Sequence, residues 1–192
     1  MSKTKIVVVD MVNGFVKEGP LHDERIMDIV PNINTLIKNR KDADIIVLED
    51  CHEKGCAEFN TFPAHCIKGT AESKTIDELQ YLFDKNMTPN LWAVVRKNST
   101  NGFFEMHING LLRNTKTYII TGCCTDICVL QLALNLKVHG NEINSPVRVI
   151  VLCDCVSTYN APNHNKEEYE AAAFKILEIA GVEVLELKDV LN

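Results

Sequence analysis

Short runs of apolar, mostly β-branched residues recur along the chain, and most are followed by a longer segment in which apolar residues have helical spacing. Such runs are typical of strands buried on both faces of a parallel sheet, and their alternation with helices is typical of an α/β fold. The pattern predicts about six strands. They lie near residues 5–9, 44–48, 92–95, 117–121, 147–152 and 182–185.

Between these runs, apolar residues return at steps of three and four positions, which is the spacing along one face of a helix. Pro31 fits the first of these segments only near the first helical turn, where a missing N–H loses no hydrogen bond. The elements together predict an α/β fold, a three-layer α/β/α sandwich around a central, six-stranded, mostly parallel sheet. The predicted helices cover 26–40, 75–85, 105–113, 126–138 and 166–180.

Two segments, 12–24 and 51–74, show no clear periodicity. Loops of this length inside a compact domain are usually functional, so both are candidate parts of a site. The glycines form neither a dinucleotide-binding nor a P-loop pattern. We therefore predict that the protein uses no nucleotide cofactor.

Length and composition narrow the function classes further. A chain of 192 residues fits one hydrophobic core, so we predict a single domain over 1–192. The formal net charge of -6 offers no basic surface for a phosphate backbone, which argues against a nucleic-acid partner. The apolar run from Ile6 meets Asp10 too soon for a signal peptide or a membrane span, so we expect no membrane partner and a cytoplasmic location. The cysteines form no secreted disulfide framework, and reduced thiols fit the same compartment.

Polar residues follow four of the predicted strands. Asp10 follows the first strand, 49–52 the second, Arg96 and Lys97 the third, and 122–128 the fourth. Ligands of open parallel sheets bind beyond the carboxyl ends of the strands. Each residue alone is most simply a solvated loop residue or a helix cap. Their joint occurrence predicts a site that combines a carboxylate, an ammonium group and a thiol.

Cys128 is the candidate nucleophile of this site. Gly122 lets the chain turn sharply out of the fourth strand, and Thr125 or Asp126 can cap the next helix, so Cys128 falls in its first turn. The helix dipole and the ammonium group of Lys97 should favour the thiolate, which is the reactive form. The simpler alternative is a buried cysteine on a very apolar helix.

The other groups that amide cleavage needs are also available. Asp10 could move a proton between the thiol and the leaving amine if burial raised its affinity for protons. Lys97 would hold the ion pair together, and the backbone N–H groups of Cys124 and Cys128 could stabilise the oxyanion. The residues therefore predict a triad of Asp10, Lys97 and Cys128.

A second group of polar residues lies around the long loop after the second strand. Asp50 and His52 alternate on an extended stretch, so both can reach one ion, and Glu58 and His65 follow. Two imidazoles with carboxylates suit one divalent metal ion, with Zn²⁺ favoured and Fe²⁺ or Mn²⁺ possible. Both histidines could instead be ordinary solvated loop residues. A softer zinc site is a further alternative, with ligands drawn from Cys51, Cys56 and Cys66.

At these residues the sequence resembles the isochorismatase-like cysteine hydrolases, and within them it is most similar to bacterial nicotinamidases. The similarity extends over nearly the whole chain. Residues 10–15, DMVNGF, resemble the opening aspartate motif of the family, and 122–128, GCCTDIC, resemble its Gly-x-x-Thr-Asp-x-Cys segment. Residues 62–70, FPAHCIKGT, resemble the metal-histidine segment that distinguishes nicotinamidases from metal-free relatives.

The resemblance implies a function and a set of roles. It implies hydrolysis of nicotinamide to nicotinate and ammonia through a cysteine thioester, in the salvage of the nicotinamide cofactor, and a small-molecule amide as the partner. A homo-oligomer is compatible with the sequence. The implied catalytic residues are Asp10, Lys97 and Cys128, and the implied metal ligands are Asp50, His52, Glu58 and His65.

The resemblance also implies details of the substrate pocket. Phe15 and Phe62 would hold the ring between them while its pyridine nitrogen approaches the metal, and a cis peptide bond would join Cys123 to Cys124. Val12 and Phe62 stand where relatives often have Gln and Trp, and 98–104 lacks the usual tyrosine. These departures leave open a related hydrolase of another small amide, such as a ureido or carbamoyl compound.

A function from another class also fits some of these residues. Clustered cysteines can serve as redox sensors or as soft metal ligands. The alternative is therefore a thiol redox or metal-binding module built on Cys123, Cys124 and Cys128. Peroxide-dependent disulfide formation without hydrolysis would distinguish it.

Overall fold

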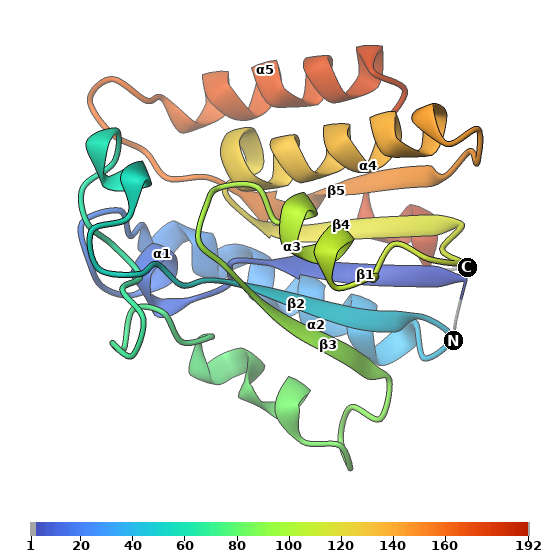
Figure 1. Ribbon diagram of the computed structural model, residues 1–192, viewed down its shortest axis with the longest axis horizontal. Helices are drawn as coiled ribbons and strands as arrows, with labels where there is room; N and C mark the ends of the chain where they lie inside the picture. Colours follow the sequence, from blue (N-terminus) through green and yellow to red (C-terminus); the bar gives the residue numbers. More distant parts are fainter. Residues whose placement is uncertain (1–2, 192) are drawn as a thin grey trace.

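The fold is built around one sheet, seen in a computed structural model that describes residues 3–191. All six predicted strands are present and every neighbouring pair is parallel, in the order β3-β2-β1-β4-β5-β6 (Figure 1). The predicted α/β fold is therefore confirmed. The strands are β1 (Thr4–Val9), β2 (Asp44–Asp50), β3 (Leu91–Lys97), β4 (Thr117–Cys123), β5 (Arg148–Ser157) and β6 (Glu183–Leu185).

Helices cover both faces of the sheet because the side chains of a strand alternate between the faces. In β1, Ile6 and Val8 pack into the core beneath α1 (Asn13–Val16), η1 (Glu24–Ile29), α2 (Val30–Asn39), η3 (Asp77–Phe83) and η5 (Leu187–Val190). Val7 and Val9 pack into the opposite core, beneath α3 (Phe103–Ile108), α4 (Leu130–Glu142) and α5 (Lys166–Ile179). Within residues 3–191, no helix is both long enough and apolar enough to span a bilayer.

The observed helices differ from the predicted ones where the chain changes between α-helix and 3₁₀ helix. The segment 26–40 divides into the 3₁₀ turn η1 and α2, with Pro31 in the first turn of α2 as expected. The segment 75–85 is only a 3₁₀ helix, and the one predicted over 105–113 runs over 103–108 and is followed by Gly110 at a positive φ of 67°. The non-periodic loops contain α1 and η2 (Ala57–Asn60), which are too short to show periodicity.

The strand order places the carboxyl ends of four strands at one edge. β1 lies between β2 and β4, so the direction of winding reverses beside it, and ligands of such sheets bind at this point. The register pairs Val9 with both Leu48 and Gly122, and pairs Asp50 with Lys97. The polar residues that end these strands are therefore brought together by the sheet itself.

Gly122 permits the close approach of β4 to β1 and gives a first testable prediction. It has a φ of +106°, and a Cβ atom there would lie 2.0 Å from the Val9 carbonyl oxygen. We expect Gly122→Ala to lower the free energy of unfolding by about 4 kcal/mol or more, because neither backbone can yield cheaply. Urea denaturation measures the change.

Gly69 offers the matched control. It has a similar φ of +86°, but a Cβ atom there would have no neighbour within 4 Å. Gly69→Ala should therefore cost only the left-handed backbone strain, about 1–2 kcal/mol. Equal losses in the two variants would show that strain, and not the contact with Val9, requires the glycine.

Candidate active site

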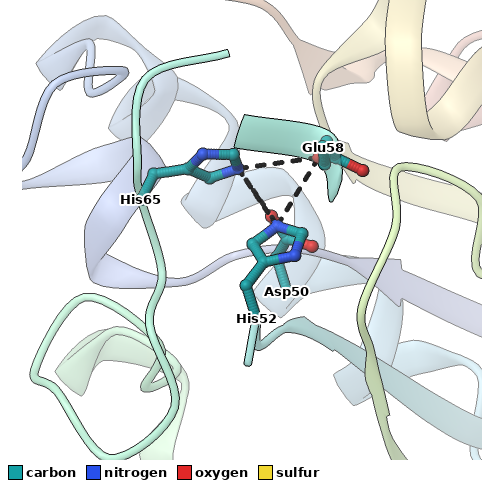
Figure 2. A group of neighbouring side chains, drawn as sticks. All are labelled: Asp50, His52, Glu58 and His65. Atoms are coloured by element: carbon teal, nitrogen blue, oxygen red, sulfur yellow. Dashed lines mark hydrogen bonds and ion pairs between the residues drawn. The ribbon is translucent and has the colours of Figure 1, made fainter. Parts of the chain in front are cut away.

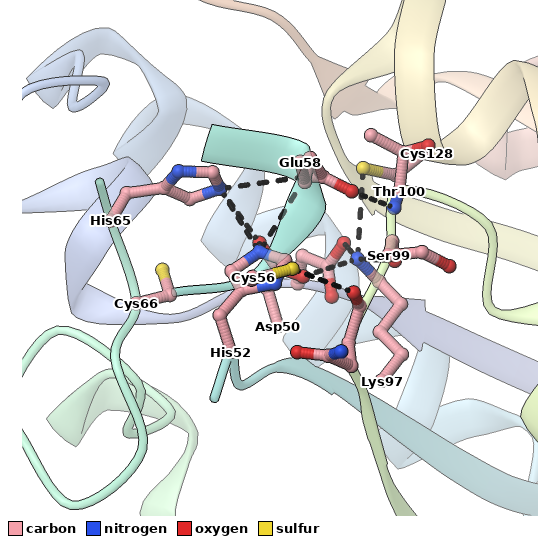
Figure 3. Close-up of polar contacts among 12 residues, drawn as sticks. Asp50, His52, Cys56, Glu58, His65, Cys66, Lys97, Ser99, Thr100 and Cys128 are labelled. Carbon is pink, nitrogen blue, oxygen red and sulfur yellow. Dashed lines mark hydrogen bonds and ion pairs between the residues drawn. The ribbon is translucent and has the colours of Figure 1, made fainter. Parts of the chain in front are cut away.

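The ammonium group of Lys97 is the centre of a buried polar network at this edge of the sheet (Figure 3). Lys97 Nζ lies 2.8 Å from Asp10 Oδ2 and 2.8 Å from Asp50 Oδ1. It donates to the Cys128 sulfur over 3.8 Å and to the Ser99 carbonyl oxygen over 3.1 Å. The structure therefore brings together the three residues of the predicted triad, which come from three separate parts of the chain.

Asp10 lies just beyond β1 in a conformation that a non-glycine residue rarely adopts. Its φ is 50°, and its N–H donates to the Leu48 carbonyl oxygen. Burial raises the pKa of the Asp10 carboxyl to about 7, against the attraction of Lys97 and with added repulsion from Asp50. A carboxyl group in this range can both accept and release a proton near neutral pH.

Cys128 corrects one expectation drawn from the sequence. It lies in η4 (Thr125–Val129), a π-helical turn that leads into α4, and its side chain is almost fully buried. Burial raises the pKa of its thiol well above the ordinary value, because Lys97 offsets only part of the penalty and the Asp10 carboxylate opposes ionisation. The thiolate is therefore not favoured at rest, and the thiol needs a base when it reacts.

The neighbouring cysteines have different environments. The bond between Cys123 and Cys124 is cis, as the resemblance implied. The Cys123 thiol is fully buried and donates to the backbone carbonyl oxygen of Asp10 over 3.1 Å. Cys124 lines the same pocket as Cys128. Cys123 is therefore a packed residue behind the pocket, and Cys124 and Cys128 face the place where a substrate can bind.

The side chains of Asp50, His52, Glu58 and His65 converge beside this network (Figure 2). Asp50 Oδ2 lies 2.9 Å from His52 Nε2 and 3.1 Å from His65 Nε2, and the two nitrogens are 3.2 Å apart. Glu58 Oε1 lies 3.5 Å and 3.8 Å from the same two nitrogens. One ligand atom from each residue lies within 4.8 Å of the others.

Hydrogen bonds from the other side of two of these groups orient them toward a metal ion. His65 Nδ1 donates to the Pro63 carbonyl oxygen over 2.8 Å, which leaves the Nε2 lone pair directed into the cluster. The N–H of Thr100 donates to Glu58 Oε2 over 2.8 Å and so orients the carboxylate. Two imidazole nitrogens and two carboxylate oxygens are a ligand set that divalent transition metals accept.

The alternative site built from cysteines finds no support. Among residues 3–191, the one group of three or more possible ligands that converges is the group of two histidines and two carboxylates. Cys56 donates to the Asn98 carbonyl oxygen and Cys66 to the Glu72 carbonyl oxygen. Cys51 also lies outside the group.

An aromatic pocket connects the two constellations. Phe15 and Phe62 line it, together with three of the metal-ligand candidates and with two cysteines, namely Asp50, Glu58, His65, Cys124 and Cys128. Several further residues of the lining are absent from the set predicted from the sequence. Tyr159 follows the end of β5, and inspecting that strand end as the other four were inspected would have found it. The further lining residues are Leu21, Thr100, Ile127 and Tyr159.

Comparison with known proteins identifies relatives across most of the chain. The chain is 29% identical to Nicotinamidase 1 of Arabidopsis thaliana, in an alignment that covers 89% of this chain and 76% of that protein. The structure of N-carbamoylsarcosine amidase from Thermoplasma acidophilum superposes with a TM-score of 0.74 at 25% identity, over 99% of both chains. A cysteine hydrolase from Pseudomonas syringae pv. phaseolicola superposes with a TM-score of 0.83 at 18% identity, over 98% of this chain and 91% of that one.

These similarities agree with the comparison to families. The Isochorismatase domain family matches residues 4–189, which include every strand of the sheet and all the residues of the polar network. The fold resemblance noted from the sequence is therefore confirmed. The chain belongs to the isochorismatase family of hydrolases.

Proposed function

We propose that the protein is a nicotinamidase-type amidohydrolase, which converts nicotinamide to nicotinate and ammonia in the salvage of pyridine nucleotides. The observation that carries the proposal is the position of Lys97, whose ammonium group contacts Asp10, Cys128 and the metal-ligand candidate Asp50 at once. The similarity to a plant nicotinamidase supports it.

The catalytic roles follow from the protonation states. As Cys128 Sγ attacks the amide carbonyl carbon, Asp10 takes the thiol proton, because the thiol is held in its protonated form and the carboxyl group has a pKa of about 7. The N–H groups of Cys124 and Cys128 would stabilise the oxyanion. Asp10 then returns the proton to the departing nitrogen, and ammonia leaves a thioester on Cys128.

Hydrolysis of the thioester completes the cycle. Asp10 is again a carboxylate and takes a proton from the attacking water, and the collapsing intermediate releases the acid product and the Cys128 sulfur. The proton held by Asp10 passes to that sulfur. Lys97 stays charged throughout, because its two carboxylate neighbours raise its pKa well above the usual value despite burial.

The metal-ligand candidates serve the ring end of the substrate. Asp50, His52, Glu58 and His65 would hold one divalent ion, with zinc favoured over iron or manganese. When bound, the ion supplies a Lewis-acidic centre that attracts a ring nitrogen. Asp50 would fix the distance between the metal ion and the catalytic residues. One of its carboxylate oxygens lies among the metal-ligand candidates, and the other contacts Lys97.

The charge of the pocket favours a neutral, flat substrate. Among the described lining residues, no lysine or arginine faces the cavity, and its walls carry phenylalanine and tyrosine rings. A substrate with its own carboxylate would therefore find no cationic side chain on these walls. A second candidate, a hydrolase of N-carbamoyl compounds, is motivated by the similarity to N-carbamoylsarcosine amidase, but this pocket suits it less well.

The experiment that tests the function is ammonia release from a panel of amides. Protein purified without chelator is supplied with nicotinamide, benzamide and N-carbamoylsarcosine, and specificity constants are compared, since selectivity is their ratio. We expect nicotinamide to be preferred and metal analysis to find one ion per chain. Preference for the carbamoyl compound would transfer the function to the second candidate. Peroxide-dependent disulfides without ammonia would favour a redox module.

The pKa of Asp10 gives a prediction for the dependence of rate on pH. Asp10 acts as a base only when ionised, so kcat/KM should rise about tenfold per pH unit below the midpoint and level off above pH 7 or so. A rate profile between about pH 5 and pH 9 measures this. A midpoint far above pH 7 would instead identify the Cys128 thiol, whose pKa burial raises, as the group that titrates.

A further inference from the structure

His164 joins the substrate pocket to the turn that carries the nucleophile, although it lies in neither. It ends the connection between β5 and α5, just before Asn165, whose side chain caps α5. Its ring lies between two tyrosine rings. The centroid distances are 4.1 Å to Tyr159, at an interplanar angle of 10°, and 4.0 Å to Tyr169, at 28°.

Both ring nitrogens of His164 are engaged. Nδ1 lies 3.0 Å from the Tyr159 carbonyl oxygen, and Nε2 lies 2.8 Å from Asp126 Oδ2. The carbonyl oxygen can only accept, so Nδ1 donates to it, and the two contacts together fix the rotation of the ring in its plane. The two stacked tyrosine rings hold the imidazole on both faces, and the two polar contacts hold it at its edge.

The backbone around His164 is also held in place. Ala161 and His164 exchange a reciprocal pair of N–H to carbonyl hydrogen bonds, of 3.0 Å and 2.9 Å. The N–H of Asn160 donates to Asp23 Oδ2 from the start of η1, over 3.0 Å. The connection is thus tied to two other parts of the molecule, and Tyr159 is the member of it that lines the pocket.

We propose that His164 is a positioning residue that holds the ring of Tyr159 as a wall of the substrate pocket and anchors this wall to Asp126, two residues before the nucleophile. This proposal rests on the proposed function, because the wall formed by Tyr159 binds the ring of the proposed substrate. His164 does not itself line the pocket, so it acts through Tyr159.

The test is a double-mutant cycle in the full-length, metal-replete enzyme, with the amide that the wild type turns over fastest. We expect His164→Ala to raise KM about tenfold and to change kcat less than about threefold, because ring binding and not chemistry is lost. In a Tyr159→Ala background the same change should have little further effect on KM. His107→Ala is the matched control, because His107 also stacks on an aromatic ring, that of Phe103, and should leave KM unchanged.

Two outcomes would overturn the proposal: an unchanged KM in folded His164→Ala, or effects of His164→Ala and Tyr159→Ala on KM that multiply independently. His164→Phe is the second variant if His164→Ala does not fold, because it keeps a ring between the tyrosines and loses both hydrogen bonds. It should still raise KM.

A readout that needs no hydrolysis separates this proposal from the proposed function. Cys128 is alkylated with iodoacetamide and with iodoacetanilide, which carries a phenyl ring, and the two rates are compared by peptide mapping. We expect His164→Ala to lower the ratio of the anilide rate to the amide rate several-fold, even if wild-type protein hydrolyses none of the amides tested. A ratio equal to that of the wild type would overturn the role of His164 while leaving the hydrolase function untouched.

Discussion

Cys128→Ala is expected to lower kcat for amide hydrolysis by at least about 10⁴-fold, because the thiol that forms the proposed thioester is lost. Among the described residues, the Cys128 thiol is the one nucleophile that both lines the pocket and accepts a hydrogen bond from Lys97. Folding should be unaffected, since alanine fills most of the same buried space. Ammonia release under single-turnover conditions measures the loss, and mass spectrometry of wild-type protein quenched during turnover should find the acyl group on Cys128.

Cys123→Ala is the matched control for this change. Cys123 is equally buried and lies five residues earlier, but it faces the backbone of Asp10 and not the pocket. Its loss should reduce the rate only modestly, through looser packing around Asp10. Equal losses in the two variants would contradict the choice of Cys128 as nucleophile.

Lys97→Met is expected to lower the free energy of unfolding strongly. Lys97 is fully buried between the carboxylates of Asp10 and Asp50, so its removal leaves two buried acidic groups without a counter-charge. Removing one partner from such a group costs about 3–5 kcal/mol of folding free energy. Urea denaturation should show this loss together with a loss of hydrolysis.

An exposed ion pair provides the comparison for Lys97. Lys68 contacts Glu53 at 2.6 Å, but both side chains are more than half exposed. Lys68→Met should leave the denaturation midpoint within experimental error, because solvent screens such pairs. If both lysine variants were as stable as the wild type, the network around Lys97 would contribute nothing to folding, and its charges would have to be compensated in another way.

The strands and the residues at their ends were predictable from sequence, and the reason is physical. Parallel strands buried on both faces need continuous apolar runs. The runs Ile6 to Val9 and Ile45 to Leu48 therefore predict two of the strands. Because all such strands end at one edge, the residues after them must lie near one another. Asp10, Lys97 and Cys128 could thus be grouped before any coordinates were known.

The features that could not be predicted depend on tertiary contacts. The thiol of Cys128 was expected to ionise because of the helix start and Lys97, but the depth of burial decides its pKa, and burial is not written in local sequence. His164 could not be found because its importance comes from ring stacking across the connection between β5 and α5, whereas Tyr159 follows a strand end and was within reach of the sequence. Short helices such as α1 carry too few residues for periodicity to reveal them.

The strand that carries Lys97, β3, is an edge strand and pairs with a neighbouring strand on one side only. The backbone groups on its outer side have no strand to pair with. Edge strands of this kind can pair with strands of other chains and so promote aggregation. Lys97 is the final residue of β3, fastened to acidic groups at the ends of the next two strands inward. The ammonium group that is proposed to take part in catalysis therefore also ties the end of an edge strand to the two strands beside it.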